Sequence, residues 1–376
     1  INLGQGFPDY HGSEVARKGA AEAIMDKPLN NQYSPTFGLN SLRESLISYY
    51  KRMHGIAFEM DQVAIVTSGT EGLFAAISAV TKPGDEVIVL EPCFPWYPLI
   101  TKRQGAKVIP VRLSPPNFAL DVKKIESAIT PRTKALIINT PHNPTGHVLT
   151  NDEANAVSQL AIKHDLMIIS DEVYENVIWD DPRKKAQLKS QKDGDVGHIR
   201  LAQLGPEIFN RTITIGSASK LFSLTGWRLG WVLAPKEIVA AINTEHSLST
   251  FCAATPLQLG VKMALDAEDG KFEGIPGLIS ENFKILAEAC QERGMEVYKS
   301  GGGHFLCAGI SKFNLSEMDF VRHMLDKSGV GVLPMSLFYC DPEEASRTAQ
   351  PAVRMAVCKQ KETILEAAKR IRNADL

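Results

Sequence analysis

The stretch Arg211-Thr-Ile-Thr-Ile-Gly-Ser-Ala-Ser-Lys220-Leu-Phe-Ser-Leu-Thr-Gly-Trp-Arg228-Leu-Gly-Trp231 places a lysine just beyond a buried strand. Residues 212–215 are apolar or β-branched, which predicts a strand, and Gly216 with the small residues after it predicts a turn out of the sheet. Lys220 then stands in a crevice, where lost hydration lowers the pKa of the amine and makes it a usable nucleophile. A solvated loop lysine is the alternative that this stretch alone leaves open.

A hydroxyl and a guanidinium flank this lysine, since Ser217 precedes it and Arg228 follows it. Both groups bind phosphate, so beside a reactive amine they suit a phosphorylated carbonyl compound, for which pyridoxal phosphate is the obvious candidate. We therefore expect Ser217 and Arg228 to contact the phosphate of such a compound.

The length, net charge and cysteine content of the chain are those of a globular enzyme. Its 376 residues allow a large core and two domains, and the net charge of −2 argues against a nucleic-acid or membrane-surface partner. Six cysteines without CxxC spacing, and no metal-site spacing of His or carboxylates, predict a reduced, metal-free, intracellular protein. Because the chain opens at Ile1 inside a motif, we expect a missing upstream piece, which leaves an organelle open beside the cytoplasm as its location.

Seven short apolar runs follow one another, with helical patterns between several of them. Periodicity over residues 70–81 predicts one helix, and Thr150-x-x-Glu153 predicts a capping box at the start of another. Continuously apolar strands that alternate with helices indicate an α/β domain on a mostly parallel sheet, whose ligands bind beyond the carboxyl ends of the strands. The runs are 63–67, 86–90, 107–111, 134–138, 166–170, 212–215 and 229–233.

Residues after the first two runs suit a phosphate and a flat ring. Ser68-Gly69-Thr70-Glu71-Gly72 opens a helix, and its free amides offer a phosphate cradle, with ordinary helix capping as the alternative. Phe94 follows the second run, and its ring can stack on a cofactor, although core packing is the commoner fate of a phenylalanine.

Residues after two later runs suit the polar edges of a pyridine ring. Asn143 can donate to a phenolate oxygen, which Tyr174 can share. Asp171 ends a buried strand, where a carboxylate is costly unless it is paired. A protonated pyridine nitrogen is one such partner, and a helix N-cap role for Asp171 is the alternative.

The first sixty residues carry weaker signals. The closely spaced glycines of Leu3-Gly-Gln-Gly6-Phe-Pro-Asp9 allow the backbone to approach a ligand, and a simple turn explains them equally well. Tyr33 reads locally as a packing residue. A helix is predicted from near Ser41, with Glu44 placed for a capping box.

The last hundred residues indicate a second, α+β unit. A helix is predicted from Asn282, strands at 295–299 and 329–333, and a helix capped by Ser316, whereas residues 182–195 suggest a solvated surface loop. Arg354 lies in a strand pattern that turns it inward, where a substrate carboxylate fits a guanidinium bidentately. A surface arginine on an edge strand is the alternative.

Several motifs occur in the order and spacing of a known family. Asn143-Pro-Thr-Gly146, Asp171-Glu-Val-Tyr174, Ser217-Ala-Ser-Lys220 and Gly226-Trp-Arg228-Leu-Gly230 together resemble the class I/II aminotransferases of pyridoxal-phosphate fold type I. The opening segment, Asn31-Gln-Tyr33 and Leu337-Phe338-Tyr339 are most similar to kynurenine aminotransferases, also called glutamine transaminase K or cysteine-S-conjugate β-lyases, and to related methionine and aromatic aminotransferases. The resemblance covers nearly all of the chain.

The resemblance implies a fold and a set of residue roles. It implies a large domain over residues 31–274, with a seven-stranded, mostly parallel sheet between helices, and a small α+β domain from residues 1–30 and 275–376. Lys220 would hold pyridoxal phosphate as an internal aldimine and then move a proton, while Asp171 pairs with the pyridinium nitrogen. The resemblance also implies that Asn143 and Tyr174 contact the phenolate oxygen and that Phe94 packs on the ring. The phosphate would be bound by Ser217, Arg228 and the amides of Gly69, Thr70 and Glu71, and Tyr33 would reach the phosphate of a partner subunit. The substrate carboxylate would be bound by Gly6, Asn143 and Arg354.

The implied reaction is ping-pong transamination between an amino acid and a 2-oxo acid in a homodimer. Residues 245–256 near the predicted pocket lack arginine, so no clamp for a dicarboxylate is evident. An aromatic rim predicts kynurenine, glutamine, methionine, Phe and Tyr as donors, with Phe251, shared across the interface, and Phe338 near the substrate. The rim residues are Phe94, Trp96, Tyr97, Phe251, Phe305 and Phe338. β-Elimination from cysteine conjugates is the alternative reaction, and an aminotransferase-like ligand sensor is the alternative of another class.

Overall fold

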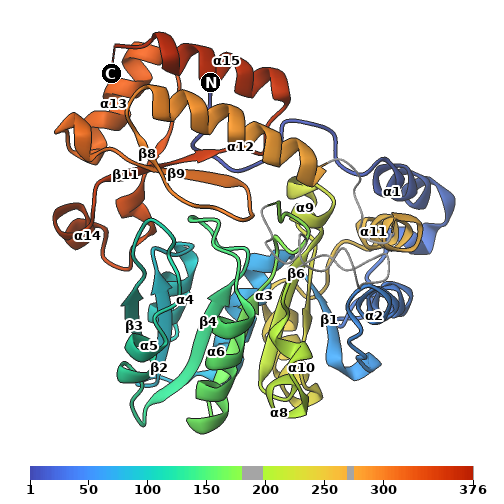
Figure 1. The fold of residues 1–376 in the computed structure, drawn as a ribbon. Helices are drawn as coiled ribbons and strands as arrows, with labels where there is room; N and C mark the ends of the chain where they lie inside the picture. The colour runs from blue at the N-terminus through green and yellow to red at the C-terminus, as the bar shows by residue number, and fades with distance from the viewer. Residues whose placement is uncertain (180–197, 269–274, 376) are drawn as a thin grey trace, which may run out of the picture.

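The computed structural model of the chain describes residues 1–179, 198–268 and 275–375 and contains two sheets (Figure 1). The larger sheet has seven strands in the order β1-β7-β6-β5-β4-β2-β3, and only β7 runs antiparallel to its neighbours. All seven predicted strands are confirmed, and so is the mostly parallel sheet. The strands are β1 (Val63–Val66), β2 (Glu86–Glu91), β3 (Lys107–Arg112), β4 (Thr133–Asn139), β5 (Met167–Asp171), β6 (Thr212–Ser217) and β7 (Gly230–Leu233).

Helices cover both faces of the large sheet, which explains why its strands are apolar without alternation. Ile137 and Ile169 face one hydrophobic cluster, while their neighbours Leu136 and Ile168 face another. A strand buried on both faces has no solvated side on which polar residues are favoured. The first cluster includes residues of α3 (Ser68–Val80), α4 (Trp96–Arg103) and α10 (Lys236–Ser249), and the second includes residues of α5 (Val122–Ser127), α6 (Asn151–Lys163) and α8 (Pro206–Phe209).

The turn after β6 depends on the absence of a side chain at Gly216. A Cβ atom there would lie 2.1 Å from Nε1 of Trp231, a fully buried side chain on the neighbouring β7. The same Nε1 donates to the Tyr50 hydroxyl at 3.1 Å. This packing fixes the strand end from which the short helix α9 (Ala218–Leu221) carries Lys220.

The two predicted capping boxes have different outcomes. At α6 the box is confirmed, since Thr150 Oγ1 accepts from Glu153 N at 3.2 Å and Glu153 Oε2 accepts from Thr150 N at 2.8 Å. At α2 (Asn40–His54) it is wrong, because Leu39 is the N-cap and makes no side-chain cap. The Leu39 amide instead donates to Oε1 of Gln258, a distant residue of α11 (Thr255–Glu268), at 2.8 Å.

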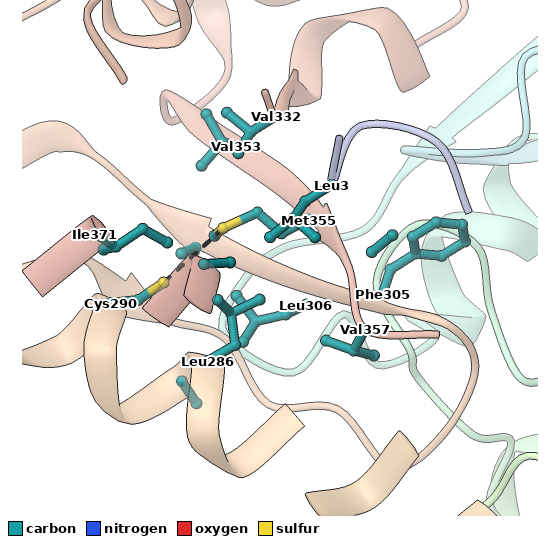
Figure 2. Packing of buried hydrophobic residues seen from close by; sticks show 14 of the residues in the cluster. Leu3, Leu286, Cys290, Phe305, Leu306, Val332, Val353, Met355, Val357 and Ile371 are labelled. Carbon is teal, nitrogen blue, oxygen red and sulfur yellow. Dashed lines mark hydrogen bonds between the residues drawn. The ribbon is translucent and has the colours of Figure 1, made fainter. Parts of the chain in front are cut away.

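The smaller sheet is antiparallel, in the order β10-β11-β9-β8. Its hydrophobic cluster joins Leu3 to residues of α12, β9, β11 and α15, and Figure 2 shows part of it, with the Cys290–Met355 sulfur contact dashed. In Figure 1 the marked chain ends lie on the side of this sheet. The elements are β8 (Glu296–Val297), β9 (Phe305–Gly309), β10 (Leu333–Pro334) and β11 (Ala352–Ala356), with α12 (Ile275–Glu292), α13 (Glu317–Ser328), α14 (Pro342–Thr348) and α15 (Lys361–Asn373).

Predictions for this unit are partly confirmed. Ser316 caps α13 as expected, its Oγ accepting from Asp319 N at 3.1 Å. The strand predicted over 329–333 is confirmed only at its last residue, where β10 begins at Leu333, because Gly329 ends α13 in a left-handed conformation and Gly331 makes an isolated bridge to Asn2. The predicted helix from Asn282 begins earlier, in α12, and the surface loop predicted for 182–195 lies outside the described residues.

The N-terminal segment crosses from one sheet to the other. The Leu3 amide donates to Gly331 O at 2.9 Å beside the small sheet. Helix α1 (Glu14–Asp26) then packs on α11, so closely that a Cβ at Gly260 would lie 2.5 Å from Ala16 O. Among the described residues, no helix combines the length and apolar character that a bilayer crossing requires.

A buried ionic network lies behind the end of β5. The carboxylate of Glu172 contacts the guanidinium of Arg200 and, at 3.0 Å, Nε2 of His198. Arg200 also lies 2.6 Å from Glu175, and these side chains are almost completely buried. Burial alone would raise the pKa of Glu172, but Arg200 and His198 outweigh it and lower that pKa. The carboxylate therefore stays ionised inside the protein.

We predict that Arg200→Ala lowers the free energy of unfolding by about 3–5 kcal/mol, because it leaves a buried carboxylate without its main cation. Lys361→Ala is the control, since Lys361 and Glu281 form an exposed ion pair at 2.6 Å; it is expected to cost about 1 kcal/mol or less. Urea unfolding at neutral pH measures both. Equal losses in the two variants would contradict the importance of the buried network.

Candidate active site

A cavity of about 410 Å³ opens where the carboxyl ends of the large sheet face the small sheet. The register places Asn139 of β4 beside Asp171 of β5, and β6 ends next to them at Ser217. Most of the residues predicted to form a site therefore meet here. Those that line the cavity are Gly6, Gly69, Thr70, Phe94, Asn143, Asp171, Tyr174, Ser217, Lys220, Arg228 and Arg354.

Five of the predicted residues lie outside this lining, and one of them is Trp96, which is 48% exposed. The Glu71 carboxylate accepts from Nδ1 of His246 at 2.8 Å, and so ties α3 to α10. Tyr33 is 84% exposed, and its ring meets that of Phe251 edge-on at 5.3 Å between centroids. Phe338 is buried, and it packs on the guanidinium of Arg354 at 4.3 Å.

Lys220 is the half-buried amine at the centre of the cavity. Its Nζ donates to Gly6 O at 3.1 Å and lies 5.6 Å from the centroid of the Tyr174 ring. Burial lowers the pKa of this amine, and the positive charges of Arg228 and Arg354 act in the same direction. A lysine with a lowered pKa is a better nucleophile and base near neutral pH.

Asp171 is a buried carboxylate supported by neutral donors. The Tyr97 hydroxyl donates to its Oδ2 at 2.6 Å, and the Val173 amide donates to its Oδ1 at 3.3 Å. Burial raises the pKa of Asp171 to about 6, although both donors oppose the rise. Asp171 can therefore hold a cationic ring nitrogen close to neutral pH.

Tyr97 is a residue whose role the sequence did not reveal. Its position after β2 predicted an aromatic rim, but the structure directs its hydroxyl to Asp171. The sequence of residues 94–97 carries no sign of that partner, because Asp171 comes from a strand 74 residues further along the chain.

Arg354 is a buried cation without a carboxylate partner in the part of the chain that the structure describes. Its NH1 donates to Asn143 Oδ1 at 3.0 Å and its NH2 donates to Gly4 O at 2.7 Å, while its Nε has no partner there. Burial lowers the pKa of this guanidinium to about 10. An anion such as a carboxylate would compensate the buried charge.

The start of α3 and the turn after β6 form a second anion-binding end of the cavity. The amides of Gly69 and Thr70 lie in the first turn of α3, where no intrahelical acceptor reaches them. The Arg228 guanidinium is exposed beside them and donates only to Thr225 O, at 2.9 Å.

The two serines of the turn are used differently. The Ser217 hydroxyl donates to Leu229 O at 3.1 Å and accepts from the Ser219 amide at 3.1 Å, so it already caps α9. The Ser219 hydroxyl also lines the cavity and is buried without a hydrogen-bond partner among the described residues. An unsatisfied buried hydroxyl is a signal for a bound polar group.

These groups fit pyridoxal phosphate by chemistry. The cavity joins an amine of lowered pKa, a carboxylate, free helix amides and a guanidinium. The amine matches an aldehyde, the carboxylate matches a pyridine nitrogen, and the helix amides together with the guanidinium match a phosphate. Arg354 remains for the carboxylate of a second molecule.

Comparison with known proteins agrees with this reading of the cavity. The model of the family "Aminotransferase class I and II" matches residues 1–371. The chain is 32% identical to the methionine aminotransferase of Escherichia coli, over 99% of this chain and 91% of the relative, and 32% identical to kynurenine–oxoglutarate transaminase 1 of the mouse with the same coverage. It superimposes on the structure of N-succinyldiaminopimelate aminotransferase from Mycobacterium tuberculosis with a TM-score of 0.89, at 34% identity, over 99% of this chain and 92% of that one. The chain therefore belongs to the class I and II aminotransferases, whose fold is that of the fold type I enzymes and whose cofactor is pyridoxal phosphate.

Proposed function

We propose that this aminotransferase moves the amino group of an aromatic or long neutral amino acid to a 2-oxo acid by ping-pong transamination. The observation that carries the proposal is the pairing of Lys220 with one buried, uncompensated arginine in a cavity whose other walls are largely apolar. Arg354 suits the α-carboxylate that every amino-acid donor shares. The apolar walls suit the side chain that distinguishes the donors.

The proposed donors are kynurenine, glutamine, methionine, Phe and Tyr. Phe7, Phe94 and Phe305 line the cavity, and among its described lining residues the only arginines are Arg228 and Arg354. If Arg228 binds the cofactor phosphate, no described arginine remains for a second carboxylate on the donor side chain. Relatives named for kynurenine and for methionine support this choice.

We propose that the chain holds its cofactor with the groups described above. Asp171 would pair with the ring nitrogen, and Asn143 and Tyr174 would donate to the phenolate oxygen. Phe94 would pack on the ring. The amides of Gly69, Thr70 and Glu71, with Ser217 and Arg228, would surround the phosphate, and the partnerless hydroxyl of Ser219 is an additional donor.

The proposed chemistry assigns proton transfer to Lys220. When bound, pyridoxal phosphate supplies an electron sink for the negative charge that develops at the substrate Cα. Nζ of Lys220 takes the proton from that Cα and returns it on the reverse half of the cycle. The lowered pKa of Lys220 leaves more of this amine unprotonated and able to accept the proton. Arg354, with Asn143 and the Gly6 backbone, holds the substrate carboxylate so that the Cα faces Nζ.

We also propose that the enzyme is a homodimer. Tyr33 and Phe251 form an aromatic pair and are 84% and 50% exposed, and Leu248, three residues before Phe251, is 81% exposed. Aromatic side chains exposed together favour contact with a partner. In the dimer, Tyr33 would reach the phosphate of the partner subunit, and Phe251 and Phe338 would lie near substrate.

The proposed domain division follows the two sheets. The large sheet lies within residues 31–274, and the small sheet lies within 275–376. Residues 1–30 would belong to the small domain through the contact of Leu3 with Gly331, while α1 packs on α11 of the large one.

A donor panel tests the proposed function. The holoenzyme is incubated with 2-oxoglutarate and one donor at a time, and mass spectrometry measures the new oxo acid. We expect kynurenine, glutamine, methionine, Phe and Tyr to exceed aspartate and N-succinyldiaminopimelate, because their side chains place no carboxylate against apolar walls. Highest turnover with a dicarboxylic donor would contradict the proposal. Pyruvate and ammonia from a cysteine conjugate, without oxo acid from any donor, would favour β-elimination.

In the same assay, Arg354→Ala is expected to raise KM by about 30-fold or more, since loss of a buried charge-assisted contact costs about 2–5 kcal/mol. The amide of phenylalanine is the matched substrate control, because it lacks the carboxylate. Its turnover should change much less than that of phenylalanine. An equal loss for both substrates would remove the assignment of Arg354 to the carboxylate.

A pH titration tests the pair of Asp171 and Tyr97. The pKa of Asp171 is raised to about 6, so affinity of the apoenzyme for pyridoxal phosphate should fall as the pH drops below 6 and the carboxylate takes up a proton. Tyr97→Phe removes a donor that stabilises the charged form. The pKa should rise further, and the fall in affinity should move to higher pH.

The measurement is the Kd for pyridoxal phosphate as a function of pH in the wild-type chain, in Tyr97→Phe and in Tyr298→Phe. Tyr298→Phe is the control, since it removes a buried hydroxyl that has no described partner and does not line the cavity. Its profile should match that of the wild type. An unshifted profile in Tyr97→Phe would show that this hydroxyl does not set the charge of Asp171.

A further inference from the structure

Two cysteines from distant parts of the chain come together near the cavity. Cys93 follows β2 and directly precedes Phe94, which lines the cavity. Cys340 follows the segment of Phe338, which packs on Arg354. Both cysteines are free thiols.

Two hydrogen bonds hold these segments side by side. The Cys93 amide donates to Phe338 O at 2.5 Å, and the Cys340 amide donates to Oε2 of Glu91 at 3.0 Å. Each bond therefore joins one cysteine to the residue two positions before the other. This crosswise pattern fixes both backbones around the thiols.

The two cysteines belong to one hydrophobic cluster. Cys340 packs against the hydrophobic cluster that contains Cys93, and Cys93 is 1% exposed while Cys340 is half-buried. The contact with the Cys340 thiol, followed by burial, raises the pKa of the Cys93 thiol. An oxidant from solvent thus meets Cys340 first, and the buried Cys93 lies in the same cluster.

We propose that Cys93 and Cys340 form a reversible disulfide that ties the segment of Phe94 to the segment of Phe338. The oxidant is a low-molecular-weight disulfide. The Cys340 thiolate attacks one of its sulfurs, breaks its S–S bond and releases one small thiol. The Cys93 sulfur then gives up its proton and attacks the Cys340 sulfur, which releases the second small thiol. Two protein thiols are oxidised, one small disulfide is reduced, and the two protons leave on the small thiols.

The bond would join backbone segments that carry different parts of the site. Phe94 precedes α4 of the large sheet's layers, and Phe338 belongs to the segment between β10 and α14. A covalent link between them would restrict any change in their separation when a substrate enters or leaves. This consequence for turnover rests on the proposed function, whereas formation of the bond does not.

Peptide mapping tests the bond. The reduced holoenzyme is incubated with oxidised glutathione, alkylated, and digested without reductant. We expect the Cys93 and Cys340 peptides to appear joined, two hydrogen atoms lighter than their sum, and to separate with dithiothreitol. Cys340→Ser and Cys93→Ala should each abolish the joined peptide. Cys252→Ser, which removes another half-buried free thiol, should retain it.

Turnover measured on the same samples tests the consequence. Oxidation should lower kcat several-fold in the wild type and in Cys252→Ser, with recovery in dithiothreitol, and should leave Cys340→Ser unchanged. If glutathione is found on Cys340 while Cys93 is recovered as an alkylated free thiol, the proposed Cys93–Cys340 disulfide does not form and the proposal is wrong. A joined peptide with unchanged kcat would overturn the restraint on the site, independently of which donor the enzyme uses.

Discussion

The burial of two adjacent carboxylates at the end of β5 is the constraint on which the rest of the structure depends. Glu172 does not line the cavity; it pairs with Arg200 and contacts His198. Asp171 lines the cavity, and its donors among the described residues are neutral, the Tyr97 hydroxyl and a backbone amide. The first carboxylate is thus satisfied within the protein, and the second is left to be completed by a cation that the cavity admits.

The cations of the cavity also lack a partner of opposite charge among the described residues. Lys220, Arg228 and Arg354 line it, yet none forms an ion pair with a described carboxylate. Keeping such groups unpaired costs stability, and the cost is recovered when anions bind. The arrangement therefore suits a ligand with a phosphate at one end, a basic ring nitrogen near Asp171, and a second molecule whose carboxylate meets Arg354.

Much of this architecture could be predicted from the sequence, because the large sheet is covered on both faces. That burial makes its strands continuously apolar, and the chemistry then lies at or just beyond their carboxyl ends, as at Asp171 and Ser217. The prediction failed where the local pattern of the sequence does not determine the structure. Gln258 replaces the expected cap of α2, and Gly329 and Gly331 interrupt an apolar run that resembles a strand.

The side-chain partners were harder to predict than the elements. Phe338 packs on the guanidinium of Arg354, and the Glu71 carboxylate ties α3 to His246 outside the cavity lining. Nothing local to either residue specifies these contacts, since each partner comes from another part of the chain. The roles proposed for Tyr33 and Phe251 depend similarly on a second subunit.

The most direct test of the account is the visible absorbance of the purified chain with pyridoxal phosphate, before and after a donor is added. We expect a yellow protein that kynurenine, glutamine or methionine bleaches in the absence of an oxo acid. In Lys220→Ala, the absorbance that depends on the lysine should be lost. A chain that stays colourless after pyridoxal phosphate is added, or a variant that keeps the wild-type spectrum and its response to donors, would contradict the central role of Lys220.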